Sequence, residues 1–171
     1  MRVIHYKRYN ATFNKPRHIQ IYAYIPLTLH NCSLMVSTSL INVSLEHGVP
    51  VDHTRACYTY LETAVYNNNV ACMNMLIKYG ADVNVDRGFP VRRACWNERV
   101  DIVDILIKAG ADVNHHGSLN PAIEDAIRYG SVVMVSRLLT AGAVLPPDTI
   151  DLARRSEKDS DDKIKVLSEF I

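Results

Sequence analysis

A stretch of nine residues occurs almost twice in this chain. The segment LIKYGADVN spans residues 76–84, and LIKAGADVN follows at residues 106–114. The glycines of these stretches, Gly80 and Gly110, have counterparts at Gly48 and Gly142, so the four glycines are spaced 32, 30 and 32 residues apart. A period of this size indicates a chain built from repeated supersecondary units. It constrains the fold more strongly than the composition does.

The residues before each glycine repeat in register. Mostly apolar pairs lie three and four positions before it and again seven and eight before it, which predicts a helix with one apolar face. A small residue stands sixteen positions before each glycine: Cys32, Ala64, Ala94 and Ala126. The glycine suits a left-handed helix C-cap, and the Asp and Asn residues after it favour a turn. Each unit is therefore predicted to be two short helices followed by a stop and a turn.

A single helix pair of this length cannot bury its own apolar face, so the units are expected to stack into one continuous core. The pattern resembles the ankyrin repeat, whose consensus it carries piecemeal. The matching first-helix segments are LTLHNCS at 27–33, TYLETAV at 59–65, FPVRRAC at 89–95 and PAIEDAI at 121–127. The resemblance implies an all-α solenoid of helix-turn-helix units with short hairpin fingers. The degenerate units are similar to those of the ankyrin proteins of large DNA viruses.

The period divides the chain into an N-terminal extension and five units. We expect an irregular basic extension at 1–24, a divergent first repeat at 25–52, repeats at 53–84, 85–114 and 115–144, and a capping repeat at 145–171. The family's inter-repeat histidine remains only at His30, and Glu62, Arg92 and Glu124 replace it, which predicts looser joints. The finger before Phe89 is short and is expected to be stunted.

Little in the sequence indicates catalysis. Hydrophobic residues make up 48% of the chain and the net charge is +1, which is typical of a globular domain. Cys32, Cys72 and Cys95 occupy core positions, Cys57 is the cysteine expected to be most exposed, and the His115–His116 pair is read as a polar turn. Nucleotide-binding and hydrolase motifs are missing from the sequence. We predict no enzyme activity, no cofactor and no metal site.

Binding residues are expected among the positions that the core does not use, on the concave face of fingers and first helices. Trp96 is the single tryptophan, and Trp, Tyr and Arg are enriched among binding hot spots. Tyr66, Trp96, Arg128 and Tyr129 are predicted to form an aromatic and basic band. The full candidate set is Tyr58, Tyr66, Asn67, Arg87, Arg92, Trp96, Asn97, His115, His116, Arg128 and Tyr129.

The leading hypothesis is a non-catalytic module that binds another protein and blocks or redirects it, as a viral or pathogen effector acting on a host factor would. An alternative is a cellular four-repeat ankyrin inhibitor of a kinase. A rival is nucleic-acid binding by the basic extension, which would depend steeply on salt concentration. We expect a protein partner rather than nucleic acid. We expect a monomer without a membrane span, located in the cytoplasm (the host cytoplasm if viral) or the nucleus.

Overall fold

In the computed structural model, the described residues are 42, 45–46, 50–52, 54–55, 58–115, 121–156 and 158–171. The predictions for residues 1–24, His30, Cys32, Gly48, Cys57 and His116 fall outside them. The elements are β1 (Thr54–Arg55), β2 (Tyr58–Thr59), α3 (Tyr60–Tyr66), α4 (Val70–Lys78), α5 (Val85–Trp96), α6 (Val100–Lys108), α7 (Ala122–Tyr129), α8 (Val132–Thr140), α9 (Thr149–Arg154) and α10 (Ser160–Ser168).

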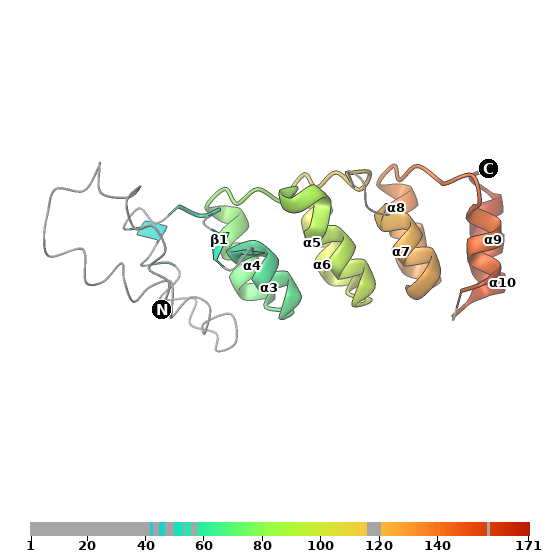
Figure 1. Ribbon diagram of the computed structural model, residues 1–171, viewed down its shortest axis with the longest axis horizontal. Coiled ribbons are helices and arrows are strands. Elements are labelled where there is room, and N and C mark those ends of the chain that lie inside the picture. The colour runs from blue at the N-terminus through green and yellow to red at the C-terminus, as the bar shows by residue number, and fades with distance from the viewer. Residues whose placement is uncertain are drawn as a thin grey trace, which may run out of the picture.

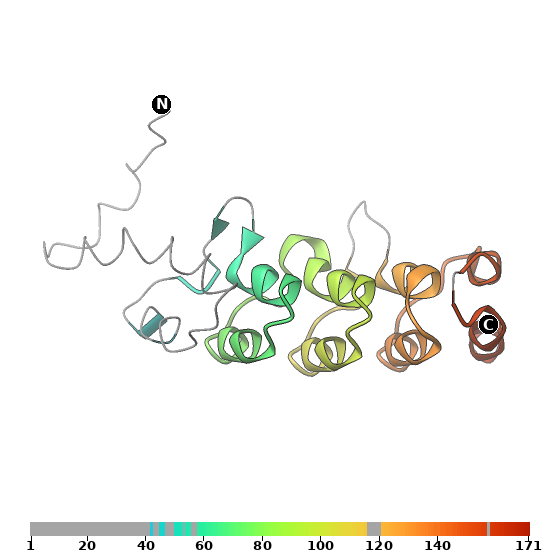
Figure 2. The same ribbon diagram turned by 90° about the horizontal axis from the view of Figure 1, so that it is seen from below.

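The helices stack in chain order along the long axis of the molecule (Figure 1). They form two rows, with α3, α5, α7 and α9 in one and α4, α6, α8 and α10 in the other (Figure 2). The first row is continuous through contacts of α3 with α5, α5 with α7 and α7 with α9. The predicted all-α ankyrin-type solenoid is therefore confirmed. One finger is a short antiparallel hairpin in which Thr54 pairs with Thr59 and Arg55 with Tyr58.

The core lies between the two rows. Small residues at the predicted first-helix position, Ala64, Ala94 and Ala126, are fully buried, because a side chain limited to one methyl group allows neighbouring helices to approach closely. Larger apolar residues of the second helices fill the remaining space, among them Leu76 and Leu106, which are also fully buried. Since the helix pairs share one cluster of buried side chains, they stabilise one another.

The second helix of each of these repeats (α4, α6 and α8) is followed by a glycine, as the repeat predicts. Gly80, Gly110 and Gly142 have φ values of +85°, +91° and +87°, in the region that favours glycine. The amide of Gly80 donates to the carbonyl of Ile77, and the amide of Ala81 donates to that of Leu76, which is a Schellman arrangement. It satisfies carbonyl groups that the end of a helix would otherwise leave unpaired.

The short finger before α5 has an unusual backbone. Asp86, Arg87 and Gly88 all have positive φ, so a left-handed turn precedes the regular part of the helix. Gly88 packs directly against the next finger, since a Cβ atom placed on it would lie 2.2 Å from the carbonyl oxygen of His115. The predicted shortening of this finger therefore brings two consecutive loops into backbone contact.

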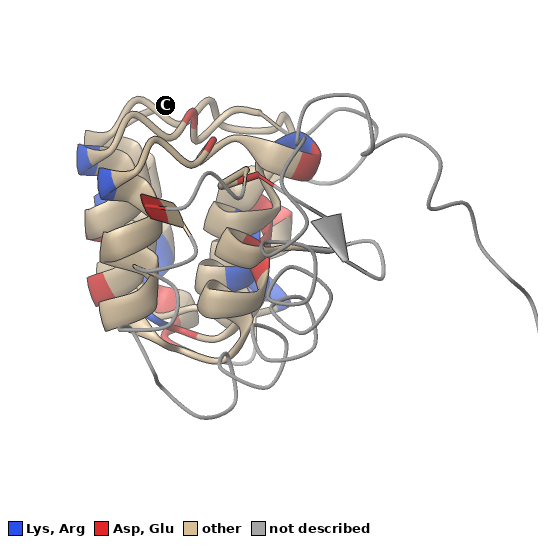
Figure 3. Cartoon of the chain, turned by 90° about the vertical axis from the view of Figure 1, so that its left-hand side faces the viewer, with Lys and Arg blue, Asp and Glu red and all other residues tan. Residues whose placement is uncertain are grey.

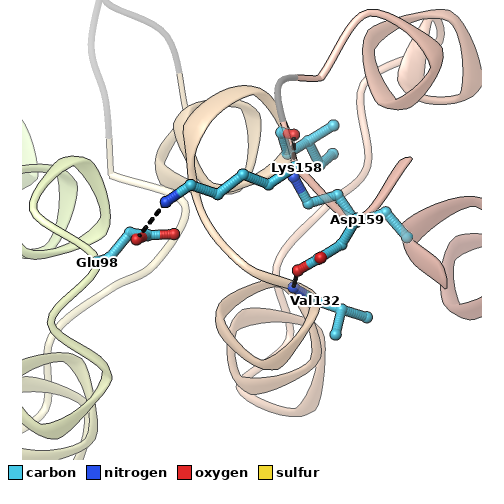
Figure 4. A network of polar contacts seen from close by, with 6 residues as sticks. Glu98, Val132, Lys158 and Asp159 are labelled. Carbon is cyan, nitrogen blue, oxygen red and sulfur yellow. Dashed lines mark hydrogen bonds and ion pairs between the residues drawn. The ribbon is translucent and has the colours of Figure 1, made fainter. Parts of the chain in front are cut away.

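The helices α9 and α10 cover the end of the stack. Lys163 of α10 is fully buried and donates a 3.0 Å hydrogen bond to the carbonyl of Ile127 in α7. Lys158 reaches past α7 and α8 to Glu98, with 2.7 Å between Nζ and Oε2, while the Asp159 carboxylate accepts a hydrogen bond from the amide of Val132 (Figure 4). Phe170 follows the end of α10 and is exposed.

Candidate protein-binding surface

Trp96 and Tyr129 form an exposed aromatic pair. They stand at the last positions of α5 and α7, and their ring centroids are 4.8 Å apart with the planes tilted by 40°. Trp96 is 54% exposed and Tyr129 is 37% exposed, although aromatic side chains of this size are more often largely buried. The pair is therefore held in place by mutual contact while its outer surface stays open to a partner.

A second aromatic contact continues this pair toward α3. The guanidinium carbon of Arg93 lies 4.2 Å from the ring centroid of Tyr66, which is within the range of a cation–π interaction. Arg93 stands one helical turn before Trp96 on α5, so this helix takes part in both contacts. We name Tyr66, Arg93, Trp96 and Tyr129 the exposed stripe. It runs along the C-terminal ends of α3, α5 and α7.

Arg93 was not among the residues predicted from the sequence. The signal that could have identified it is its spacing of three residues before Trp96, which places both side chains on one side of a helix. Its position in the unit corresponds to Thr63 and Asp125, neither of which suggested a ligand-binding role.

Two predicted arginines make ion pairs within the scaffold. Arg128 donates two hydrogen bonds to Oε1 of Glu124, four residues earlier in α7, at 3.1 and 2.8 Å. Arg92 of α5 points to α7, with its Nε 3.7 Å from the Asp125 carboxylate. This ion pair connects two neighbouring repeats, and Arg92 stands at the position where the family has its inter-repeat histidine. The predicted band therefore has Arg93, rather than Arg128, as its stacked cation.

Asp125 is the buried acid of this region. Only 5% of the residue is exposed, and this burial raises the pKa of its carboxyl group to about 6. The positive charge of Arg92 opposes the rise, and the negative charge of Glu124 adds to it. Burial, helped by the Asp125 carboxylate, also raises the pKa of the Cys95 thiol well above its ordinary value. A thiol in this state is protonated and inert, as expected for a core residue.

The remaining predicted residues are distributed over both ends of the first helices. Asn67 and Asn97 are C-cap residues of α3 and α5, next to the exposed stripe. Arg87 and His115 are exposed on the finger side, at the opposite end of these helices. Tyr58 lies in β2, and its side chain is outside the described part of the structure. The candidates thus form two separate groups.

Charge is mixed over the described surface. In a view along the stack, both rows of helices carry Lys and Arg as well as Asp and Glu (Figure 3). On the second-helix row, Arg137 and Asp104 line a shallow depression between α6 and α8 and lie 3.6 Å apart.

In the described ranges, three or more His, Cys, Asp or Glu side chains do not cluster as metal ligands would. Helices long and apolar enough to cross a membrane are likewise missing from those ranges.

The comparison with known families agrees with the geometry. A family profile described as ankyrin repeats (3 copies) matches residues 29–117, which is more than half of the chain. A search of curated proteins found no match to this chain. The matched segment includes α3 to α6 with their glycine stops and ends just before α7. The chain belongs to the ankyrin-repeat family, whose repeats form protein–protein interaction modules.

Proposed function

We propose that this protein binds another protein through the exposed stripe and blocks or redirects that partner without catalysing a reaction. The observation that carries the proposal is the exposure of Trp96 and Tyr66, at 54% and 56%, on a continuous row of packed helices. Large aromatic side chains supply much contact area and lose little conformational entropy on binding, because they have few rotatable bonds.

The stripe is preorganised for such a contact. Tyr66 is covered on one side by the guanidinium of Arg93, and Trp96 contacts Tyr129. Side chains that are already held in one arrangement pay less entropy when a partner docks. The proposal includes a pathogen effector acting on a host factor and a cellular kinase inhibitor, because both would act by occupying a surface of the partner. It places the protein in the cytoplasm or nucleus, where a free thiol such as that of Cys95 is maintained.

The experiment immobilises this chain and its variants and compares, quantitatively, which other proteins each of them retains. The double variant Tyr66→Ala/Trp96→Ala removes the two most exposed aromatic side chains of the stripe. Val133→Ala is the matched control, since Val133 is 51% exposed on α8, in the other row of helices. Proteins that the wild type and Val133→Ala retain are expected to be lost from the double variant.

Circular dichroism must first show that all variants remain folded. Equal retention by the folded double variant and the wild type would place the binding site elsewhere. For each partner recovered, the fluorescence of Trp96 provides a direct assay, because it is the only tryptophan in the chain. Docking on the stripe should shift its emission to shorter wavelength, and binding elsewhere should not.

A further inference from the structure

We infer that the partner presents an acidic peptide segment to the exposed stripe, with a carboxylate that pairs with Arg93 and apolar side chains that cover Trp96 and Tyr129. This inference rests on the proposed function and adds the chemical class of the partner. Its evidence is the charge state of the surface around the stripe.

Arg93 carries a positive charge that the described scaffold does not neutralise. Five of the other arginines of the described region have a carboxylate within 4.0 Å, namely Arg92, Arg99, Arg128, Arg137 and Arg154. Among the described residues Arg93 has no such neighbour, and its Nε atom is buried without a hydrogen-bond acceptor. A partner's carboxylate would therefore meet the terminal NH₂ groups of Arg93, and it would supply the counter-charge that the described scaffold does not.

The acidic residues beside the stripe already have partners. Glu124 is paired with Arg128, Asp125 with Arg92, and Glu98 with Lys158. A basic partner would therefore meet carboxylates whose charge is neutralised, whereas an acidic partner meets an unpaired guanidinium. This difference favours an acidic segment over a basic one.

The position of Arg93 suits recognition of a carboxylate. The guanidinium carbon of Arg93 lies over the Tyr66 ring, and its terminal NH₂ groups, unlike the buried Nε atom, are free to donate hydrogen bonds to a carboxylate. Trp96 lies one turn away on the same helix, so apolar side chains next to the acid would exclude water from the ion pair. Exclusion of water strengthens an ion pair because it lowers the local dielectric constant.

The test uses a phage-displayed library of short random peptides selected on the immobilised full chain. Recovered peptides are expected to contain Asp or Glu next to aromatic or aliphatic residues. Affinities are then measured by titration calorimetry for the wild type, Arg93→Gln, Arg93→Lys and the control Arg137→Gln on α8. Arg93→Gln should weaken binding about tenfold or more, Arg93→Lys should weaken it less, and Arg137→Gln should leave it unchanged.

A change in the peptide provides a second measurement that needs no protein variant. Replacing its acidic residue by the corresponding amide should weaken binding to the wild type and have little effect on Arg93→Gln, since the two groups form one interaction. Recovery of basic or uncharged peptides that depend on Trp96 would overturn the acidic partner and leave the stripe as the binding site. Peptides that bind equally well to Tyr66→Ala/Trp96→Ala would overturn the proposed function as well.

Discussion

The side-chain amide of Asn114 donates a 2.9 Å hydrogen bond to the carbonyl oxygen of Gly142, 28 residues further along the chain. Its carbonyl oxygen accepts a 2.8 Å bond from the amide of Val144 in the same loop. Asn84 makes the equivalent bonds to Gly110 and Asp112. The asparagine of the repeated stretch therefore connects each loop to the next one.

Asn114→Ala is expected to lower the free energy of unfolding by about 1–2 kcal/mol, because it removes two hydrogen bonds between adjacent loops. Urea titration followed by circular dichroism measures the change. Asn74→Ala is the control, since Asn74 is exposed on α4. Equal stabilities of Asn114→Ala and the control would show that the loop connection contributes nothing.

Two glycines with positive φ should respond differently to alanine. Gly110→Ala places its methyl group in open space and is expected to cost about 1–2 kcal/mol for the backbone conformation alone. Gly88→Ala adds a collision with the carbonyl oxygen of His115, so we expect a loss of about 3 kcal/mol or more. Thermal and urea unfolding of both variants gives the comparison. Similar losses would mean that the two fingers separate easily.

Asp125 should make stability depend on pH. Because the pKa of its carboxyl group is raised from 3.8 to about 6, its favourable contribution is present below pH 4 and is lost as the pH rises past 6. The shift corresponds to about 3 kcal/mol. Asp125→Asn cannot ionise, so its stability relative to the wild type should rise by up to that amount between pH 4 and pH 7.

Unfolding free energies measured across this range test the expectation for Asp125. Asp162→Asn is the control, because Asp162 is exposed on α10. If the wild type and Asp125→Asn show parallel pH profiles, the Asp125 carboxyl group titrates normally in the folded protein.

Lys163 should be replaceable by an apolar side chain of similar length. Lys163→Met loses the bond to the Ile127 carbonyl but also removes the cost of burying an amine, whose pKa burial lowers, so we expect a change within about 1 kcal/mol. Lys163→Ala leaves a cavity and should cost about 2–4 kcal/mol. Thermal melting of both variants, with the exposed Lys165→Met as control, distinguishes the outcomes. An equally large loss in Lys163→Met would assign the stability to the hydrogen bond.

Several local features could be predicted from the sequence because they depend on short-range spacing. The apolar pairs before Gly80, Gly110 and Gly142 predicted amphipathic helices, and each glycine adopts the predicted C-cap conformation. The small first-helix residues Ala64 and Ala94 are buried where close helix packing requires them. These features follow from the 3.6-residue turn of a helix and from the freedom of glycine to adopt positive φ.

The contacts between helices depend on information that the spacing lacks. Equivalent positions in the repeat grouped Tyr66, Trp96, Arg128 and Tyr129; the structure places Trp96 against Tyr129, but it directs Arg128 to Glu124. Arg93 was missed for the same reason, and so was the burial of Lys163, which a pattern of apolar residues assigns to solvent.

The sequence by itself determined the period, the helix pairs, the glycine stops and the membership of the ankyrin-repeat family. Only the tertiary structure decided which exposed side chains meet, because the rotation and offset of neighbouring helices set the distance between residues such as Arg93 and Tyr66. It also decided which charges are neutralised between repeats, since the partners of pairs such as Arg92 and Asp125 or Arg137 and Asp104 come from different helices. For that reason the unpaired guanidinium of Arg93, on which the inferred acidic partner rests, could not be identified from the repeat alone.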